Sequence, residues 1–286
     1  MSQIEVKNLT YVYSAGAGTP KRALNCINLS IEKGEFIGLI GTTGSGKSTF
    51  AKQLNALLKP TSGAVLLDGI DIWQNAQAKP ELAREVRFKV GLVFQYPEYQ
   101  LFEDTVYNDI AFGPKNMGLC DADVKEKVLA ACKFVNLDLN LLQKSPFDLS
   151  GGEKRKVAIA GVLSMDPEIL VLDEPTVGLD PCARESLLEQ LYRYHKEKDK
   201  TIILISHRME DIAKYSDRVI VLSDGNLVMF DSAGNVFGCD KVLNEAGLKV
   251  PQICSIMTKL KAGAIPDLND KVLTVDGAVT ELLKFV

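Results

Sequence analysis

Hydrophobic and polar positions follow two different periods along this chain. Short apolar runs rich in β-branched residues predict strands. They are Val65–Leu67, Val90–Phe94, Ile169–Leu172, Thr201–Ile205, Arg218–Leu222 and Leu227–Phe230. Longer segments between them carry apolar residues at helical spacing, as in Ser48–Leu58. Because Ile169–Leu172 and Ile202–Ile205 are apolar throughout, as in parallel strands covered on both faces, the pattern predicts a layered α/β core.

Two regions break this alternation. Between about Pro97 and Leu163 the helical patterns Asp123–Asn136 and Glu153–Leu163 occur without a convincing strand, which predicts a helical subdomain at about residues 97–163. After about Ser232 a Gly-Asn break leads to apolar residues at i, i+3, i+4 and i+7. These are Ile253, Ile256, Met257 and Leu260. They predict an amphipathic helix in a small C-terminal extension, residues 233–286, and the stripe packs either on its own domain or on a partner.

Size and composition limit the classes of protein to which this chain can belong. With 286 residues, of which 46% are hydrophobic and 24% charged, the chain suits one large domain plus an appendage. A net charge of −4 argues against a nucleic-acid binder. Six scattered cysteines without a C-x-x-C pair indicate free thiols in a reducing cytosol. No signal-peptide layout and no apolar stretch near the ~20 residues of a membrane span are present, so we expect a cytosolic or membrane-peripheral protein.

A glycine-rich segment follows the apolar run Phe36–Ile40 and matches the phosphate-loop pattern G-x-x-x-x-G-K-[ST]. Its residues are Gly41, Thr42, Thr43, Gly44, Ser45, Gly46, Lys47, Ser48 and Thr49. Such a loop turns backbone N–H groups toward a polyphosphate at a helix N-terminus. Lys47 is expected to reach the β- and γ-phosphates, and the Ser48 hydroxyl to bind Mg²⁺. The alternative is a glycine-rich turn with a stray lysine, but chance gives the pattern in roughly one such chain in a hundred.

Two carboxylates, Asp173 and Glu174, end the apolar run Ile169–Leu172 in the arrangement called Walker B. At the carboxyl end of a strand, Asp173 is expected to hold the Mg²⁺ shell and Glu174 to polarise the attacking water. A solvated acidic turn is the alternative. It would be the better interpretation of the acidic pair alone, but the upstream phosphate loop disfavours it.

A third motif indicates the family to which the chain is similar. Leu149-Ser150-Gly151-Gly152-Glu153 resembles the LSGGQ signature of ATP-binding-cassette (ABC) ATPases, with Gly151 lying 22 residues before Asp173 (173 − 151). The resemblance implies an α/β P-loop NTPase with an ABC-type nucleotide-binding domain at about residues 1–232. It also implies that the signature of one subunit faces the ATP of another. Glu153 departs from the commoner glutamine, and we expect hydrolysis to survive this difference.

Other residues match the same family in order. Gln95 resembles the Q-loop glutamine that touches Mg²⁺, and Asp180 in Val177–Asp180 resembles the D-loop aspartate that reaches across the dimer. His207 resembles the switch histidine at the γ-phosphate. Tyr13 resembles the aromatic residue that stacks on adenine, with Tyr11 as the alternative. The other histidine, His195, lies in a charged run and is expected on the solvated surface.

Closer resemblance points to the ATPases of energy-coupling-factor (ECF) transporters, which take up vitamins or metal ions. It rests on Phe94–Phe102, on Ala111–Pro114 and on Arg155–Leu163 running on to Pro181. The chain looks like the second of the two ECF ATPase types, which usually pairs with a sister ATPase. The resemblance also implies that the extension, residues 233–286, is a dimerisation domain whose stripe forms an ATPase–ATPase interface that persists without nucleotide. In that family a groove beside the Q-loop receives coupling helices carrying an arginine. Glu98 is the expected acidic partner, with an exposed turn acid as the alternative.

The resemblance therefore implies an ATPase with Mg²⁺ as cofactor, peripheral on the cytoplasmic side of the cell membrane. Its implied partners are a second ABC ATPase, a transmembrane coupling subunit and a small membrane substrate-binding subunit, with no nucleic acid. A conventional binding-protein-dependent ABC importer is the nearest alternative. A soluble ABC protein acting on DNA or ribosomes, and a module that binds ATP without hydrolysing it, are the alternatives from other classes. Intact Glu174 and His207 argue against the non-hydrolysing module.

Overall fold

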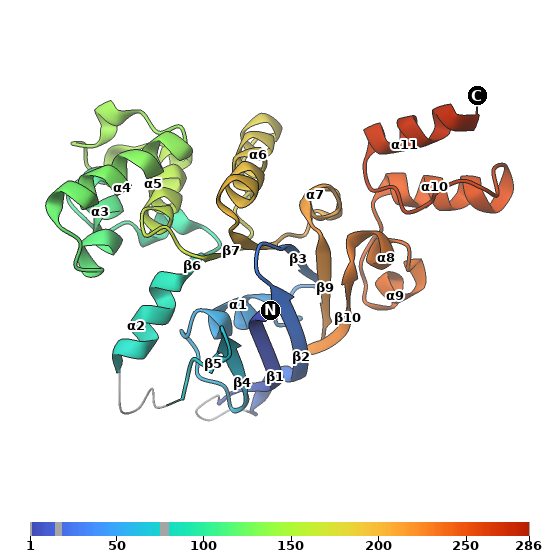
Figure 1. The fold of residues 1–286 in the computed structure, drawn as a ribbon, viewed down its shortest axis with the longest axis horizontal. Coiled ribbons are helices and arrows are strands. Elements are labelled where there is room, and N and C mark those ends of the chain that lie inside the picture. Colours follow the sequence, from blue (N-terminus) through green and yellow to red (C-terminus); the bar gives the residue numbers. More distant parts are fainter. Residues whose placement is uncertain (1, 15–18, 75–79, 286) are drawn as a thin grey trace. The chain divides into compact units, whose positions relative to one another are not determined.

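The computed structural model describes residues 2–14, 19–74 and 80–285 of the chain, and these form two compact units (Figure 1). The first unit comprises Met1–Phe50, Lys59–Asp71 and Ile203–Val286. The second comprises Ala51–Leu58 and Ile72–Ile202. Helix α1 (Lys47–Leu54) and strand β8 (Thr201–Ile205) each contribute residues to both.

The first unit contains an antiparallel sheet of four strands in the order β2-β1-β4-β5. Its strands are β1 (Ser2–Tyr13), β2 (Lys21–Glu32), β4 (Ser62–Leu67) and β5 (Ile70–Asp71). Val6 of β1 lies opposite Leu29 of β2 on one side and Val65 of β4 on the other. These three residues are therefore paired across the sheet. The strand predicted at Val65–Leu67 is confirmed as part of β4. Strands β1 and β2 were not predicted.

The same unit contains β3 (Phe36–Gly41), which pairs in parallel with β9 (Arg218–Ser223), and β10 (Asn226–Ser232), which pairs antiparallel with β9. Every residue of β3 is buried. This matches a strand covered on both faces. Helix α7 (Met209–Tyr215) packs on β3 so closely that a Cβ at Gly38 would lie 2.4 Å from the Ile212 side chain. The two strands predicted at Arg218–Leu222 and Leu227–Phe230 are confirmed within one to two residues at each end.

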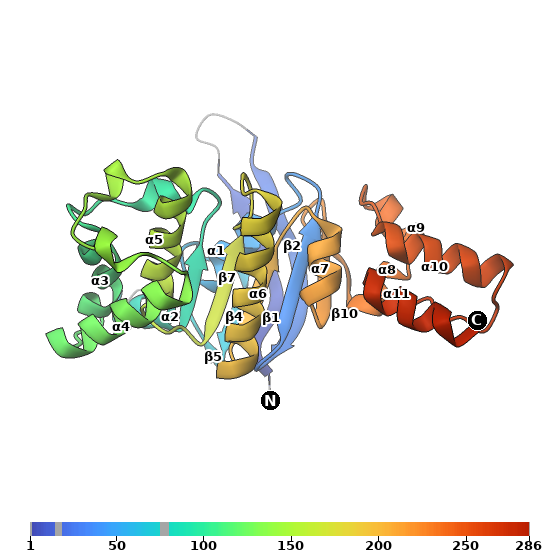
Figure 2. The ribbon, with the colours of Figure 1, turned by 90° about the horizontal axis from the view of Figure 1, so that it is seen from above.

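The residues after Ser232 form four short helices, visible in Figures 1 and 2. They are α8 (Ala233–Phe237), α9 (Asp240–Glu245), α10 (Gln252–Gly263) and α11 (Val275–Leu282), with a final 3₁₀ turn η4 (Leu283–Phe285). The predicted stripe lies on α10. Met257 is fully buried in a cluster with Leu268 and Ala278, and Ile253 and Leu260 pack against that cluster. The stripe therefore packs largely within the extension, while Ile256 remains half exposed.

The second unit contains two parallel strands, β6 (Val90–Val93) and β7 (Ile169–Asp173), with Val93 opposite Leu172. Its longer helices are α2 (Pro80–Lys89), α3 (Val106–Asn116), α4 (Asp121–Phe134), α5 (Gly151–Leu163) and α6 (Pro181–Lys198). The 3₁₀ turns η1 (Pro97–Gln100), η2 (Leu139–Leu141) and η3 (Pro146–Asp148) complete it. All of residues 97–163 are described, and they contain no strand. Figure 2 shows α3, α4 and α5 side by side. The domain limits 97–163 and 233–286 stay predictions.

Candidate functional site

The phosphate-loop segment connects β3 to α1, so the predicted order of strand, loop and helix is present. Lys47 is the first residue of the helix and is almost completely buried. Its Nζ donates hydrogen bonds to the carbonyl oxygens of Gly41, at 2.8 Å, and Thr42, at 2.9 Å. These bonds hold a positive charge over the loop at the N-terminus of α1, where the helix dipole also favours an anion.

Gly46 shows why this loop needs glycine. Its φ angle is +104°, and a Cβ built there would lie 2.5 Å from the carbonyl oxygen of Ala23. Any other residue would meet the neighbouring backbone as well as an unfavourable φ angle. Gly44 also has a positive φ, +83°, but nothing lies within 4 Å of its hypothetical Cβ.

The phosphate loop forms one wall of a 310 Å³ pocket, which lies at the lower end of the roughly 300–1,000 Å³ typical of small-ligand clefts. Its lining residues are Tyr13, Lys21, Ala23, Gly44, Gly46, Lys47, Ser48 and Thr49. The Tyr13 hydroxyl lies 3.2 Å from Thr49 Oγ1, and its ring meets Tyr11 edge to face at 4.8 Å. Tyr13 thus contributes an aromatic surface to this pocket, which favours Tyr13 over Tyr11 for stacking on a base.

His207 also belongs to the first unit, two residues after the end of β8. Its side chain is exposed, and the following turn is closed by a 3.0 Å hydrogen bond from the Arg208 N–H to Ser206 Oγ. The histidine therefore stands at the carboxyl end of a buried strand, as its predicted role requires.

The two Walker B carboxylates lie in the second unit. All five residues of β7, ending with Asp173, are buried. Glu174 follows with φ +51°, a left-handed conformation that is uncommon for a residue other than glycine and recurs at functional sites. The Val177 N–H donates to the Glu174 carbonyl at 3.3 Å. This turn directs the chain away from the sheet immediately after the two acids.

Gln95 is exposed and follows the carboxyl end of β6, the parallel neighbour of β7. Since parallel strands end at the same edge, Gln95 and Asp173 both lie at that edge of the pair. Tyr96, with φ +58°, then turns the chain into η1. The two side chains offer oxygen ligands, and so does Ser48 in the first unit. Oxygen ligands are the type that Mg²⁺ prefers.

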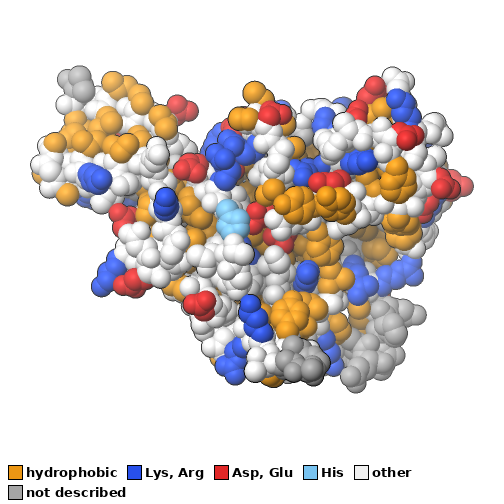
Figure 3. Space-filling model, turned by 180° about the vertical axis from the view of Figure 1, so that it is seen from behind, with side chains coloured by type: hydrophobic (Ala, Val, Ile, Leu, Met, Phe, Trp, Pro, Cys, Tyr) orange, Lys and Arg blue, Asp and Glu red, His pale blue; other side chains and the backbone are white. Residues whose placement is uncertain are grey.

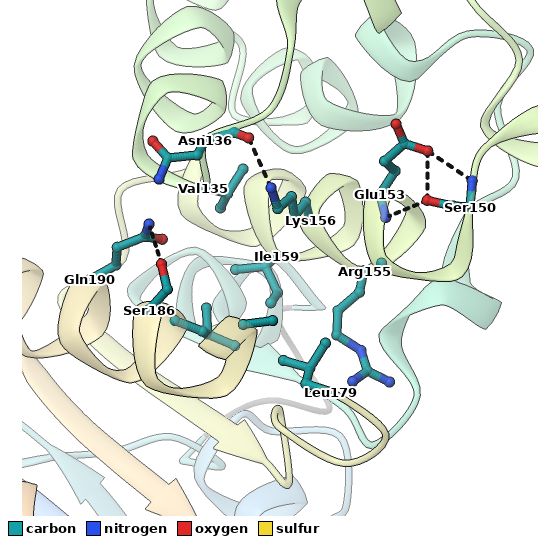
Figure 4. Close-up of a pocket in the computed structure, with 13 residues that line it drawn as sticks. Val135, Asn136, Ser150, Glu153, Arg155, Lys156, Ile159, Leu179, Ser186 and Gln190 are labelled. Atoms are coloured by element: carbon teal, nitrogen blue, oxygen red, sulfur yellow. Dashed lines mark hydrogen bonds between the residues drawn. The ribbon is translucent and has the colours of Figure 1, made fainter. Parts of the chain in front are cut away.

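The signature segment forms the N-terminus of α5 as a capping box (Figure 4). Glu153 Oε2 accepts from the Ser150 N–H at 2.9 Å and from the Ser150 hydroxyl at 2.6 Å. The Glu153 N–H donates to Ser150 Oγ at 3.4 Å. The bonds from Ser150 lower the pKa of the Glu153 carboxyl. Either glutamate or glutamine can close such a box, which gives a local reason why this signature accepts Glu153.

Asp180 caps the next helix. Its Oδ1 accepts from the N–H groups of Cys182, at 2.9 Å, and Ala183, at 3.0 Å, at the start of α6. The thiol of Cys182 is free, and the residue is exposed. The D-loop aspartate therefore has a local structural role that the motif alone did not indicate.

Glu98 differs from its sequence-based interpretation. Both carboxylate oxygens are engaged by Arg155 of α5, with Nη2 to Oε1 at 3.1 Å and Nε to Oε2 at 3.3 Å. Only 17% of the Glu98 side chain is exposed. Glu98 is therefore not a solvated turn acid, and it already has an internal partner in Arg155. Its partner lies 57 residues away in the sequence, beyond the reach of any local pattern.

His195 was predicted on the solvated surface, and this was wrong. The residue is 2% exposed, and its Nδ1 lies 2.7 Å from the Lys200 carbonyl oxygen. Leu188, Leu191 and His195 recur at helical spacing on the buried face of α6. That period, and not the surrounding run of charges, decides where the side chain lies.

This combination of a phosphate loop entering a helix, a Walker B strand and a signature capping box defines an ABC-type ATPase. The family model described as ABC transporter matches residues 24–177. The chain belongs to this family and, within it, to the ATP-binding proteins of ECF transporters, as the following relatives show.

The energy-coupling factor transporter ATP-binding protein EcfA2 of Acetivibrio thermocellus is 50% identical over 99% of this chain and 98% of its own length. The EcfA2 protein of Clostridium acetobutylicum is 47% identical over 98% and 97%. Among solved structures, cbiO1 of Clostridium perfringens, part of the ABC transporter complex cbiONQ, has a TM-score of 0.72 and 35% identity, covering 90% of this chain and 99% of that one. The predicted fold class, ATPase activity and ECF resemblance are confirmed.

Proposed function

We propose that this chain hydrolyses ATP to energise uptake of a vitamin or metal ion through an ECF-type transporter. The observation that carries the proposal is the near-complete coverage by EcfA2 proteins, because it includes both the segment after Gln95 and the C-terminal extension. Those are the regions in which a conventional importer ATPase is expected to differ. None of the described helices combines the length and apolar character that a membrane span requires. The proposed place is peripheral, on the cytoplasmic side of the cell membrane.

In the proposed mechanism the residues act by position and charge. Lys47 and the phosphate-loop N–H groups bind the phosphates, and Tyr13 stacks on the base. Ser48, Gln95 and Asp173 would hold Mg²⁺, which neutralises charge on the phosphates when bound. Glu174 orients the attacking water, and His207 contacts the γ-phosphate.

A second ATPase subunit completes the proposed site. Ser150, Gly151 and Gly152 bind the ATP of that subunit, with Asp180 beside them. Gly151 and Gly152 leave open space where a side chain would stand, so that a phosphate can approach the helix N-terminus. We propose a sister ATPase as this partner, in a heterodimer.

The extension carries an apolar surface suited to holding the two ATPases together. Val275, Val279 and Leu283 are exposed at spacings of four residues, beside Phe285. Figure 3 shows hydrophobic side chains gathered on the part of the surface that the extension forms. The face of α10 that was predicted to dimerise is largely occupied by the extension's own core, so we assign the contact to α11 instead. A chain truncated after residue 232 should lose the dimer that persists without nucleotide, measured by light scattering.

A groove of 240 Å³ in the second unit is the proposed docking site for a coupling helix of the transmembrane subunit. Phe102 and Phe112 line it and meet edge to face at 4.9 Å, with both rings half exposed. Asp109 also lines the groove, whereas Glu98 does not. Burial raises the pKa of the Asp109 carboxyl despite the N–H groups of Phe102 and Glu103 that it accepts. Because Asp109 lines the groove and Glu98 is already paired with Arg155, we propose Asp109 as the acid for an incoming arginine.

The proposal is tested by affinity purification of this chain from detergent-solubilised native membranes, with partners identified by mass spectrometry. Recovery of a sister ATPase, an integral coupling subunit and a small membrane binding protein is expected. Recovery of paired permease subunits with an extracytoplasmic binding protein would assign the chain to the conventional importers. Recovery without any membrane protein would contradict the transport function.

A further inference from the structure

Arg155 is a buried cation on the signature helix that contacts two other motif segments of the second unit. Its side chain is 9% exposed and extends from α5, five residues after Ser150. The guanidinium binds both carboxylate oxygens of Glu98, at 3.1 and 3.3 Å, and Nη1 donates a hydrogen bond to the Val177 carbonyl oxygen. Figure 4 shows the side chain pointing from α5 toward the loop that contains Leu179. One side chain thus links the signature helix, the segment after Gln95 and the loop after Glu174.

The geometry requires arginine. A guanidinium is planar and presents five N–H donors in a fixed fork, so one edge can bind a carboxylate while the remaining nitrogen donates elsewhere. Lysine has a single nitrogen on a flexible stem and cannot reproduce both contacts with the same alignment. A buried cation without its partners is strongly unfavourable, so the three segments are held together as long as the guanidinium stays in place.

The two contacts of Arg155 lie close in sequence to residues with proposed roles in hydrolysis. Glu98 belongs to η1, which begins two residues after Gln95 and is entered through the left-handed Tyr96. Val177 is bonded in turn to Glu174, because its N–H donates to the Glu174 carbonyl at 3.3 Å. The turn that sets the direction of Glu174 is therefore fixed at one end by β7 and at the other by Arg155.

We propose that Arg155 is a positioning residue for hydrolysis. It fixes the turn from Glu174 to Asp180 relative to the segment after Gln95, so that movement of η1 changes the placement of Glu174. The inference rests on the proposed role of Glu174. It adds a physical link between that carboxylate and η1, whose last residue, Gln100, lines the proposed docking groove. No contact with nucleotide is assigned to Arg155 itself.

The test uses Arg155→Lys and Glu98→Gln in the full chain, with Lys156→Gln as the matched control. Lys156 is the next residue of α5, is exposed, and donates to the Asn136 carbonyl without touching Glu98 or Val177. Hydrogen exchange should speed up at the amides of Val177 and Leu179 in Arg155→Lys, because their turn loses its anchor. In the purified complex, kcat should fall about ten- to a hundredfold with KM for ATP within twofold, since misplacement by ~1 Å is enough for such a loss.

A charge swap separates the positioning role from simple stabilisation. The double variant Glu98→Arg with Arg155→Glu can re-form the ion pair, but a carboxylate at residue 155 cannot donate to the Val177 carbonyl oxygen. Thermal stability should therefore recover relative to either single change while kcat stays low. Recovery of both thermal stability and kcat in the double variant would overturn the proposal. So would an Arg155→Lys variant whose kcat and hydrogen exchange equal those of the parent. Loss of ATPase activity in the parent complex would contradict the proposed function instead, and the exchange experiment distinguishes the two failures because it needs no turnover.

Discussion

Adding one methyl group at Gly46 tests the phosphate loop most directly. In Gly46→Ala the new Cβ would lie 2.5 Å from the Ala23 carbonyl oxygen, while ordinary van der Waals contact begins at 3.4 Å. The loop and β2 must therefore separate locally by about 0.9 Å to relieve the contact, which is the size of misplacement that costs on the order of a hundredfold in rate. Gly44→Ala is the matched control, since its φ is also positive but no atom lies within 4 Å.

Both substitutions carry the backbone cost of a left-handed alanine, about 1–2 kcal/mol. Only Gly46→Ala also displaces the N–H groups that face the phosphates, and each charge-assisted bond lost removes about 1.5–3 kcal/mol. We expect ATP affinity to fall about 10- to 100-fold more in Gly46→Ala than in Gly44→Ala. Calorimetric titration with Mg-ATP at matched fractions of folded protein measures this difference. Equal affinities in the two variants would refute the steric argument for this loop.

Four further predictions follow from single side chains. Lys47→Ala should abolish ATP-dependent turnover in the complex, and activity above about a tenth of the parent would contradict its role at the phosphates. Glu174→Gln should bind ATP but stall in the closed dimer, which gel filtration with ATP would detect; near-normal turnover would exclude it as the residue that orients water. Ser150→Ala should lower the unfolding free energy by about 1 kcal/mol through loss of the α5 cap, measured by chemical denaturation, and an unchanged midpoint would argue against the capping box. Burial raises the pKa of the Asp166 carboxyl, but the ion pair and hydrogen bond with Lys200, together with the charges of Lys127 and Lys198, outweigh it and the net shift is downward. Lys200→Met should therefore cost about 1 kcal/mol at pH 7, and the difference should shrink as the pH falls below the ordinary value of 3.8; a constant difference would contradict the linkage.

Secondary structure was predictable from the sequence where burial on both faces imposed a continuous apolar run. Strands β7 and β8 match their predicted ranges to within one residue for this reason. Strand β1 was not predicted because register shifts interrupt its pairing with β2, for example between Val6 and Leu9. These shifts break the alternation of apolar and polar residues by which a strand is recognised. Helix α1 ends at Leu54, four residues before its predicted end, because Ala56 adopts φ +52° and the chain leaves the helix there.

The motif residues themselves were predictable because each motif is local. Their side-chain partners were not. The pairing of Glu98 with Arg155 joins segments 57 residues apart, and no periodicity or motif in either segment indicates it. The prediction for His195 was wrong for the opposite reason, since a local run of charges concealed the helical period that buries Leu188, Leu191 and His195 on one face of α6. Long-range pairs of this kind require the folded chain.

The exposed thiol of Cys182 is a native site at which a fluorescent dye can be attached. It lies two residues after Asp180 at the start of α6, where the proposed dimer would bring a second subunit close. Burial raises the pKa of both Cys132 and Cys254 to about 11, so neither reacts readily near neutral pH. Replacing Cys26, Cys120 and Cys239 with serine would leave Cys182 as the single reactive position for an environment-sensitive dye. Opening and closing of the ATPase pair would then be read as a change in fluorescence during each cycle, without introducing a foreign cysteine.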